Sequence, residues 1–371
     1  MKKLGLIINP IAGIGGAVGL KGSDGEEIQK LARERGAVGQ AETKAKIALA
    51  HMRSSAIPVT VCTAAGRMGG DAAAALGFTV ETLADFGAHT TGADTEHLAR
   101  ALARIPVDLL CFAGGDGTAR DVCAGTRGTV PVLGIPAGVK IHSGVYAISP
   151  AIAGETIRRC LSSPFATHQA EVMDLDEDAY RQGRLKARLY GFMPVPALRG
   201  NMQNPKAASH NNPDDLFGLC CEIEDRIRSE SNPDICYVFG AGSTVYSIME
   251  HLGCRGTLIG VDVVQDGRVI LADGTAPQLL EIVKRRPARL IVTAIGGQGH
   301  IFGRGNQQLS PGVIRAVGTE NIWIAAAASK IFSLDDQTLY VDTGDETLDA
   351  ELRGYRRVIV DHGGCLMCRV R

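Results

Sequence analysis

The residues best suited to chemistry form a glycine-rich turn with one carboxylate, Phe112-Ala113-Gly114-Gly115-Asp116-Gly117-Thr118. The turn follows an apolar run, 107–112, and precedes a segment with the composition of a helix start, 119–122. Backbone N–H groups at a helix N-terminus can surround phosphates, while a fixed Asp can reach a substrate hydroxyl. The turn therefore predicts a phosphoryl-transfer site with Asp116 as the catalytic residue. The residues expected to bind phosphate are Gly114, Gly115, Gly117 and Thr118. A turn that is rich in glycine for packing alone is the alternative.

A second glycine-bearing turn, 9–16, follows the first apolar run, 4–8. Glycine frees backbone amides to ring an anion, and a lysine farther along can supply a point charge. The turn is not a Walker A sequence, because the terminal Gly-Lys-Ser/Thr is absent. The residues that we assign here to ligand binding are Asn9, Pro10, Gly13 and Lys21.

Three further loops, each past an apolar run, carry polar candidates. Lys140 lies in 134–143 and either contacts a charged phosphate donor or is a solvated surface lysine. Ser243 and Thr244 precede a predicted helix, where Ser243 either binds substrate or caps the helix N-terminus. Arg304 and Asn306 belong to the glycine-laced loop 296–307, which we expect to contact substrate or phosphate because such loops are seldom mere connections.

These motifs resemble those of a kinase superfamily. Phe112 to Thr118 is similar to the GGDGT element shared by NAD kinases, diacylglycerol kinases and sphingosine kinases, and Asn9-Pro10 is similar to the element used on the donor nucleotide. Gly242 to Ser247 resembles the Gly-Ser-Thr-Ala-Tyr-Ser element with which NAD kinases hold the acceptor dinucleotide. Read in order, nearly the whole chain resembles the predicted ATP- or polyphosphate-dependent NAD kinase family.

The resemblance implies transfer of a phosphoryl group from ATP or polyphosphate to the 2′-hydroxyl of NAD, with Mg²⁺ as cofactor. In that reaction Asp116 orients the hydroxyl and accepts its proton. The chain departs from the family's Pro-x-Gly-Thr-x-Asn loop at Val139-Lys140. The Asn-Asp or Asn-Glu pair that many NAD kinases use on the nicotinamide ribose also has no clear counterpart. A kinase for another hydroxyl acceptor such as a lipid, and a non-catalytic nucleotide sensor, therefore remain alternatives.

Composition limits the partners. The 371 residues suit two domains, and a formal net charge of −1 with 45% hydrophobic and 21% charged residues shows no bias toward nucleic acid or membrane surfaces. The ten cysteines are scattered through apolar runs, so we expect a reducing cytoplasm. Cys365 and Cys368 have metal-like spacing without a second pair, and we expect them to be bystanders. We also expect a homo-oligomer.

The segments that must position these residues alternate between strand and helix. Expected strands cover 4–8, 58–62, 78–83, 107–112 and 130–135, and expected helices cover 26–35, 42–53, 71–76, 95–105 with Asp94 as N-cap, and 151–161. Such alternation predicts an α/β fold with a mostly parallel sheet wrapped by helices, whose ligands gather at the carboxyl ends of the strands.

The second half changes character after about residue 160. A hairpin around Arg181–Arg184 is followed by a helix over 213–229, strands 235–239, 257–264 and 289–295, and helices 245–252 and 277–285. We therefore expect an N-terminal nucleotide-binding domain over 1–155 and a mixed α/β or β-rich substrate domain over 156–335. The final segment, 336–371, is expected to return to the N-terminal domain.

Overall fold

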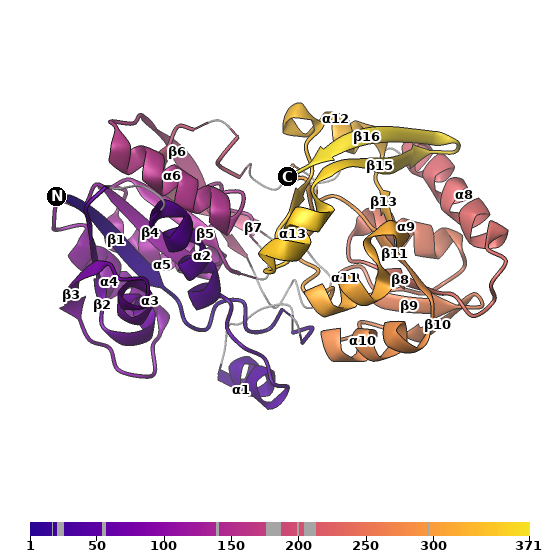
Figure 1. Ribbon diagram of the computed structural model, residues 1–371, viewed down its shortest axis with the longest axis horizontal. Helices are drawn as coiled ribbons and strands as arrows, with labels where there is room; N and C mark the ends of the chain where they lie inside the picture. Colours follow the sequence, from indigo (N-terminus) through magenta and orange to yellow (C-terminus); the bar gives the residue numbers. More distant parts are fainter. Residues whose placement is uncertain are drawn as a thin grey trace. The chain divides into compact units, whose positions relative to one another are not determined.

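The computed structural model describes residues 1–16, 18–20, 26–53, 57–138, 141–175, 187–198, 200–203, 213–295 and 297–371. The chain forms two compact units (Figure 1). Unit 1 consists of Met1–Gly15 and Gly22–Pro205, and unit 2 of Gly16–Lys21 and Lys206–Arg371. None of the described helices is long and apolar enough to cross a membrane.

Unit 1 is built on a parallel sheet of five strands in the order β3-β2-β1-β4-β5. Parallel strands are covered on both faces, so they appear in sequence as continuous apolar runs, and all five lie close to their expected positions. Their bounds are β1 Lys2–Ile8, β2 Val59–Ala64, β3 Thr79–Ala84, β4 Leu109–Gly114 and β5 Val132–Pro136. In register, Ile8 lies beside Ala113, and Gly114 beside Pro136. The loops after β1, β4 and β5 therefore leave from one edge of the sheet.

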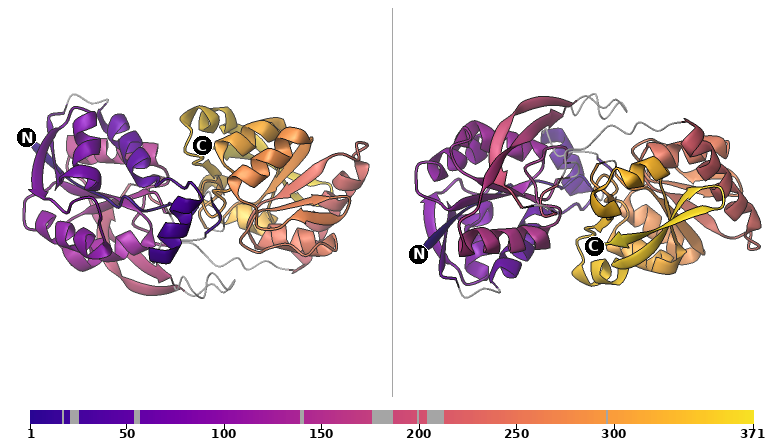
Figure 2. Two further views of the ribbon diagram at one scale, coloured as in Figure 1. Left: turned by 90° about the horizontal axis from the view of Figure 1, so that it is seen from below. Right: turned by 90° about the horizontal axis from the view of Figure 1, so that it is seen from above.

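Helices cover both faces of this sheet (Figure 2). One apolar cluster joins the strands to α2 (Ala41–Arg53) and α6 (Pro150–Ser162), and the other joins them to α4 (Gly92–Leu102) and α5 (Asp116–Thr126). The remaining helices are α1 Glu26–Glu34, α3 Gly70–Ala75 and the 3₁₀ turn Gly66–Met68.

Helix α4 begins earlier than expected. Thr91 is its N-cap, and Asp94 is the third helical residue, whose carboxylate accepts a hydrogen bond from the Thr91 backbone N–H at 2.8 Å. This reciprocal capping box, in place of a simple Asp94 cap, moves the start of the helix to Gly92.

An antiparallel hairpin follows α6 and belongs to unit 1. Its strands are β6 (Thr167–Leu175) and β7 (Ala187–Pro196), and buried residues from both pack in the same cluster as α4 and α5. The hairpin predicted from the sequence is therefore present, although its turn at 181–184 lies outside the described residues. The division between the units falls after Pro205, whereas we expected it after 155, because this hairpin packs on the first sheet.

Unit 2 contains a mixed sheet in the order β10-β9-β8-β11-β13-β15-β16. Strands β8, β11, β13 and β15 run parallel, and the strands at both edges pair antiparallel. The bounds are β8 Cys236–Phe239, β9 Asp262–Gln265, β10 Arg268–Leu271, β11 Ala288–Val292, β13 Ile322–Ala325, β15 Gly354–Asp361 and β16 Gly364–Val370. A second, two-stranded sheet pairs β12 (His300–Phe302) with β14 (Tyr340–Val341).

The helices of unit 2 match the expected positions over 213–229, 245–252 and 277–285. Their bounds are α8 Pro213–Ser229, α9 Ser243–His251, α10 Ala276–Arg285, α11 Pro311–Val317, α12 Ala328–Phe332 and α13 Glu346–Leu352, with 3₁₀ turns Thr319–Asn321 and Asp335–Gln337. The final segment does not return to unit 1, contrary to our expectation, because β15 and β16 extend the unit 2 sheet beside β13. Together the two units confirm the predicted α/β fold with a parallel N-terminal sheet and a mixed second domain.

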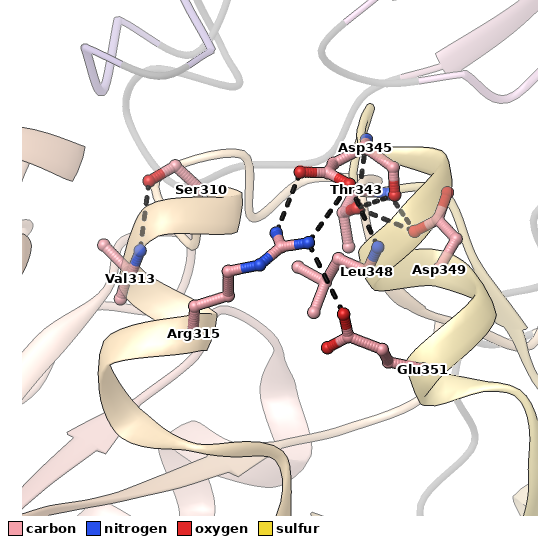
Figure 3. Close-up of polar contacts among 8 residues, drawn as sticks. All are labelled: Ser310, Val313, Arg315, Thr343, Asp345, Leu348, Asp349 and Glu351. Carbon is pink, nitrogen blue, oxygen red and sulfur yellow. Dashed lines mark hydrogen bonds and ion pairs between the residues drawn. The ribbon is translucent and has the colours of Figure 1, made fainter.

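A polar clamp joins α11 to α13 (Figure 3). Arg315 Nη1 lies 2.8 Å from Asp345 Oδ2, and Arg315 Nη2 lies 3.6 Å from Glu351 Oε1. Asp345 is also the N-cap of α13 and accepts a hydrogen bond from the Leu348 N–H at 3.0 Å. That backbone hydrogen bond and the Arg315 guanidinium hold the pKa of Asp345 below its ordinary value.

Candidate active site

Asp116 is the first residue of α5, directly past the carboxyl end of β4. Gly115, in an extended conformation with φ of −117°, is the N-cap residue between them. The Asp116 side chain therefore lies at the positive end of the α5 helix dipole. Asp116 is only 7% exposed. An ionised carboxylate this well buried requires hydrogen-bond donors around it.

The loop after β5 supplies those donors. The His142 N–H donates to Asp116 Oδ2 at 2.8 Å, and the Ser143 N–H donates to Oδ1 at 3.1 Å. The Ser143 hydroxyl also donates to Oδ1 at 2.6 Å, and His142 Nδ1 lies 3.3 Å from Oδ2. Two loops that are separated in sequence therefore fix one carboxylate from both sides.

Two further residues hold this arrangement in place. Ser143 Oγ accepts a hydrogen bond from the Met173 N–H at 2.9 Å, which ties the loop to β6. The Tyr146 hydroxyl donates to the Gly115 carbonyl at 2.6 Å, and its ring packs edge-on against Phe112 at 5.3 Å between centroids. Tyr146 thus contacts both the end of β4 and the turn before α5.

The Asn-Pro turn meets the GGDGT turn directly. Asn9 donates from Nδ2 to Thr118 Oγ1 at 2.9 Å, and the Asn9 N–H donates to the Ala113 carbonyl at 3.0 Å. Its neighbour Pro10 is buried. Three loops that start at one edge of the sheet are therefore joined by hydrogen bonds among residues of unit 1.

Two glycines allow these loops to approach closely. Gly13 has φ of +76°, and a Cβ atom there would lie 2.3 Å from the Ala137 carbonyl oxygen. At Gly114 a Cβ atom would lie 2.3 Å from Thr118 Oγ1. The Gly114 carbonyl accepts from the N–H groups of Ala137 and Gly138, both at 2.9 Å. Neither Gly13 nor Gly114 has room for a side chain. The other glycine of the motif, Gly117, lies in the first turn of α5.

Two of the predicted cationic residues, Lys21 and Lys140, lie outside the described residues.

In unit 2, Ser243 and Thr244 begin α9. The N-cap is Gly242, with φ of +125°, so Ser243 is the first helical residue and not the cap that one interpretation of the sequence assigned to it. Thr244 is buried, and its Oγ1 accepts a hydrogen bond from Lys330 Nζ at 3.4 Å. Lys330 also donates to Thr293 Oγ1 at 3.3 Å. Lys330, in α12, therefore links the first turn of α9 to the segment that follows β11.

Arg304 and Asn306 are both buried within their own loop in unit 2. Arg304 Nη1 lies 2.9 Å from Asp342 Oδ2. Asn306 donates from Nδ2 to the Ile301 carbonyl at 2.9 Å and accepts from the Gly303 N–H at 3.1 Å. These contacts order the glycine-rich loop beside β14.

Several of the residues that build the site were missed by sequence reasoning. His142, Ser143 and Tyr146 follow the fifth strand, in the loop from which we selected only Lys140. Their position past a strand end was the available signal, because polar residues there face the ligand edge of a parallel sheet. Lys330 follows four alanines and Ser329, and it carries no such signal.

Cys365 and Cys368 do not form a metal site. Cys365 lies opposite Ile359 and is exposed, whereas Cys368 lies opposite Arg356 and is buried. Residues three apart in a strand point to opposite faces, so their sulfur atoms cannot share an ion. Within the described residues no group of three or more His, Cys, Asp or Glu side chains could hold a metal.

Comparison with known protein families identifies both halves of the chain. Residues 4–165 match the ATP-NAD kinase N-terminal domain, and residues 232–367 match the ATP-NAD kinase C-terminal domain. A search of curated proteins found no match. The first match contains all five strands of the parallel sheet except the first two residues of β1, together with Asp116 and the loop that holds it. The second contains the mixed sheet from β8 into β16. The chain therefore belongs to the ATP-NAD kinase family, a family of phosphotransferases.

Proposed function

We propose that the protein is an NAD kinase that transfers the terminal phosphoryl group of ATP or polyphosphate to the 2′-hydroxyl of NAD, giving NADP. One observation supports this most strongly. Asp116, in a turn of the kinase type, is buried at the N-terminus of α5 and held by four contacts from the loop after β5. Both domains of the ATP-NAD kinase family, present over most of the chain, support the same activity.

The proposed chemistry follows from the loose transition state of phosphoryl transfer, in which charge spreads over the equatorial phosphate oxygens. Backbone N–H groups that already point at this charge stabilise it without reorganisation. The first turn of α5 and the glycine-bearing turn after β1 are the proposed sources. As the new O–P bond forms and the bond to the leaving phosphate breaks, the acceptor hydroxyl loses its proton, and this activation depends on Asp116.

Mg²⁺ is the proposed cofactor, and it would neutralise the charge of the donor phosphates. Both Asp116 oxygens accept hydrogen bonds from the chain, and no cluster of metal-binding side chains occurs in the described residues. We therefore propose that Mg²⁺ enters as the complex with ATP or polyphosphate.

The other binding roles are also proposals. For phosphate and nucleotide contacts we propose Asn9, Pro10, Gly13, Lys21, Gly114, Gly115, Gly117, Thr118, Lys140, Ser243, Thr244, Arg304 and Asn306. A homo-oligomer is supported by the exposed apolar side chains Leu189, Tyr190 and Phe192 on β7, and size-exclusion chromatography with light scattering tests it. The free thiol state of all ten cysteines fits the proposed cytoplasmic location.

The assay is direct. Purified protein with Mg²⁺ is given ATP or polyphosphate together with NAD, NADH or a lipid acceptor. NADP is then detected with a dehydrogenase that accepts only the 2′-phosphorylated dinucleotide. We expect NADP from NAD with at least one donor. Phosphorylation of the lipid alone, or no product with any pair, would refute the proposal.

A further inference from the structure

His142 is a buried imidazole beside Asp116 that the reaction described so far does not use. It is only 5% exposed, and its Nδ1 lies 3.3 Å from Asp116 Oδ2. Its Nε2 is also buried and has no hydrogen-bond partner among the described residues. Burying a polar atom without a partner costs free energy, so such an atom at a candidate active site needs an explanation.

The Asp116 contacts determine which nitrogen of His142 carries the proton. An ionised carboxylate only accepts hydrogen bonds, so Nδ1 beside Oδ2 must be the protonated nitrogen. In the neutral ring Nε2 then carries a lone pair and is an acceptor. The carboxylate itself is less available, because the N–H groups of His142 and Ser143 and the Ser143 hydroxyl already donate to it.

We propose that His142 is a catalytic residue and that its Nε2 takes the proton of the acceptor hydroxyl, while Asp116 positions the ring. The inference rests on the proposed kinase function. In the step, the hydroxyl oxygen forms its bond to the transferred phosphorus as the bond from phosphorus to the leaving phosphate oxygen breaks. The hydroxyl proton moves to Nε2, and the resulting imidazolium is stabilised through Nδ1–H by the Asp116 carboxylate. The pair thus works as a carboxylate-imidazole dyad.

A second buried acceptor flanks the same segment. Gln203 donates from Nε2 to the Ile141 carbonyl at 3.4 Å, which assigns the other end of its amide as the oxygen. This Oε1 is buried without a hydrogen-bond partner among the described residues, like Nε2 of His142. Two unsatisfied acceptors beside 141–143 favour a ligand that donates hydrogen bonds, as the hydroxyl groups of a ribose do.

The His142 and Asp116 side chains have similar exposure to solvent. The side chains of His142 and Asp116 are 5% and 6% exposed, so the two residues are enclosed to the same extent. Catalytic hydrogen bonds are often incomplete without substrate and tighten only in the complex.

The first test needs no turnover. Nitrogen-15 NMR of the full chain with labelled histidine identifies the protonated ring nitrogen, and the His142 signal is assigned by its loss in His142→Gln. We expect protonation at Nδ1, with Nε2 unprotonated, in the parent protein. Protonation of Nε2 in the neutral ring would overturn the proposal.

The second test is a double-mutant cycle on kcat for NADP formation with Asp116→Asn, His142→Gln and the double variant. Groups that act as one unit are strongly non-additive. We expect each single variant to lose at least about 100-fold in kcat, and the double variant to be no slower than the slower single one. His168→Gln, at an exposed position of β6, is the matched control and should keep the parent kcat.

A merely structural His142 would give a different pattern: His142→Gln would lower the melting temperature but keep kcat within a few-fold of the parent. That outcome would overturn the proposal. If His142→Gln fails to fold, the His142 ring signals are assigned in the parent by through-bond correlation with the His142 backbone, and the NMR measurement then decides. A parent that makes no NADP would refute the proposed function instead, and the NMR result would still decide whether Asp116 leaves Nε2 free to accept a proton.

Discussion

Asn9 and Thr118 are joined side chain to side chain, by a hydrogen bond of 2.9 Å from Nδ2 to Oγ1, although 109 positions separate them. Asn9 begins the glycine-bearing turn after β1, and Thr118 ends the one after β4; both turns lie at the same edge of the unit 1 sheet. Thr118 is 3% exposed, so its hydroxyl has little access to water. The bond therefore aligns the two turns that are proposed to hold the donor phosphates.

Breaking this bond should cost stability and donor affinity together. We expect Asn9→Ala and Thr118→Val each to lower the free energy of unfolding by about 1–2 kcal/mol, because one buried partner is left unsatisfied. The double variant should lose less than the sum, by about 0.5–1.5 kcal/mol. Urea denaturation measures this coupling, and pairing Asn9→Ala with Thr129→Val gives the control, since Thr129 bonds only locally to the Thr126 carbonyl. Full additivity in the Thr118 pair would contradict the alignment role.

Asp116→Asn should preserve the fold and lower kcat by at least about 100-fold, because the amide keeps the size but cannot accept from every donor around it. Kinetics of NADP formation and the melting temperature measure the two effects. Asp71→Asn is the control, since Asp71 also lies in the first turn of a helix but is exposed. Parent-like kcat in Asp116→Asn would remove Asp116 from catalysis.

Gly13→Ala should destabilise unit 1 more than Gly66→Ala. Both glycines have positive φ, +76° and +65°, so both variants carry the strain of about 1–2 kcal/mol that a Cβ atom causes there. Only at Gly13 does the new methyl also meet a carbonyl oxygen, at 2.3 Å, and nothing lies within 4 Å at Gly66. Overpacking adds about 1–3 kcal/mol. Equal melting temperatures of the two variants would contradict the close approach of the loops.

Asp345 should make unit 2 sensitive to acid. Its pKa lies below the ordinary 3.8, so its stabilising contribution is complete above that pH and is lost as the pH falls through the lowered value. Asp345→Asn keeps a good N-cap but loses the ion pair with Arg315. Both side chains of this pair are more than a third exposed, so water screens it. We therefore expect a loss of less than about 1 kcal/mol at neutral pH.

The difference in stability between Asp345→Asn and the parent should shrink as the pH falls below 3.8 and through the lowered pKa of Asp345, because the carboxyl then becomes neutral like the amide. Fluorescence of Trp323, the single tryptophan of the chain, follows the unfolding of unit 2. Asp266→Asn, at an exposed turn, is the matched control for the change from Asp to Asn. A difference in unfolding free energy between Asp345→Asn and the parent that stays constant from neutral to acid pH would contradict the role of the Asp345 carboxylate.

Cys365 should be the first thiol to react with iodoacetamide at about pH 8. Burial raises the pKa of Cys62, Cys160 and Cys220 to about 11, so their reactive thiolate forms are scarce. Cys365 is exposed on β16. Peptide mass spectrometry over time measures the order, and Cys365→Ser should remove the fast step. Early labelling of Cys62 would show that the first sheet opens readily.

The sequence was most informative about unit 1. Each buried parallel strand is a continuous apolar run, and the polar turn after it marks the ligand edge, so the strands and Asp116 could be located from local pattern alone. The site was less predictable, because the partners of Asp116 come from 26 and 27 positions away. No local pattern in the chain encodes which loop closes on which carboxylate.

The boundaries show the same limit. The β6–β7 hairpin and the β15–β16 hairpin each have a readable local pattern, but what they pack against is decided by contacts made far along the chain. We expected 156–205 to belong to the second domain and 336–371 to the first. The apolar residues of the β6–β7 hairpin instead pack with unit 1, and those of the β15–β16 hairpin pack with unit 2.

The short segment Gly16–Lys21 has a consequence for dissecting the protein. It belongs to unit 2, although the residues on both sides of it belong to unit 1, and a Cβ atom at Gly16 would lie 3.0 Å from the Gln307 side chain. The chain therefore passes between the units three times, and neither unit corresponds to one uninterrupted stretch of coding sequence. A recombinant fragment that starts at 206 would lack residues 16–21 of unit 2. A fragment that ends at 205 would contain residues 16–21 without the rest of unit 2. Supplying 16–21 as a separate peptide should therefore stabilise the 206–371 fragment.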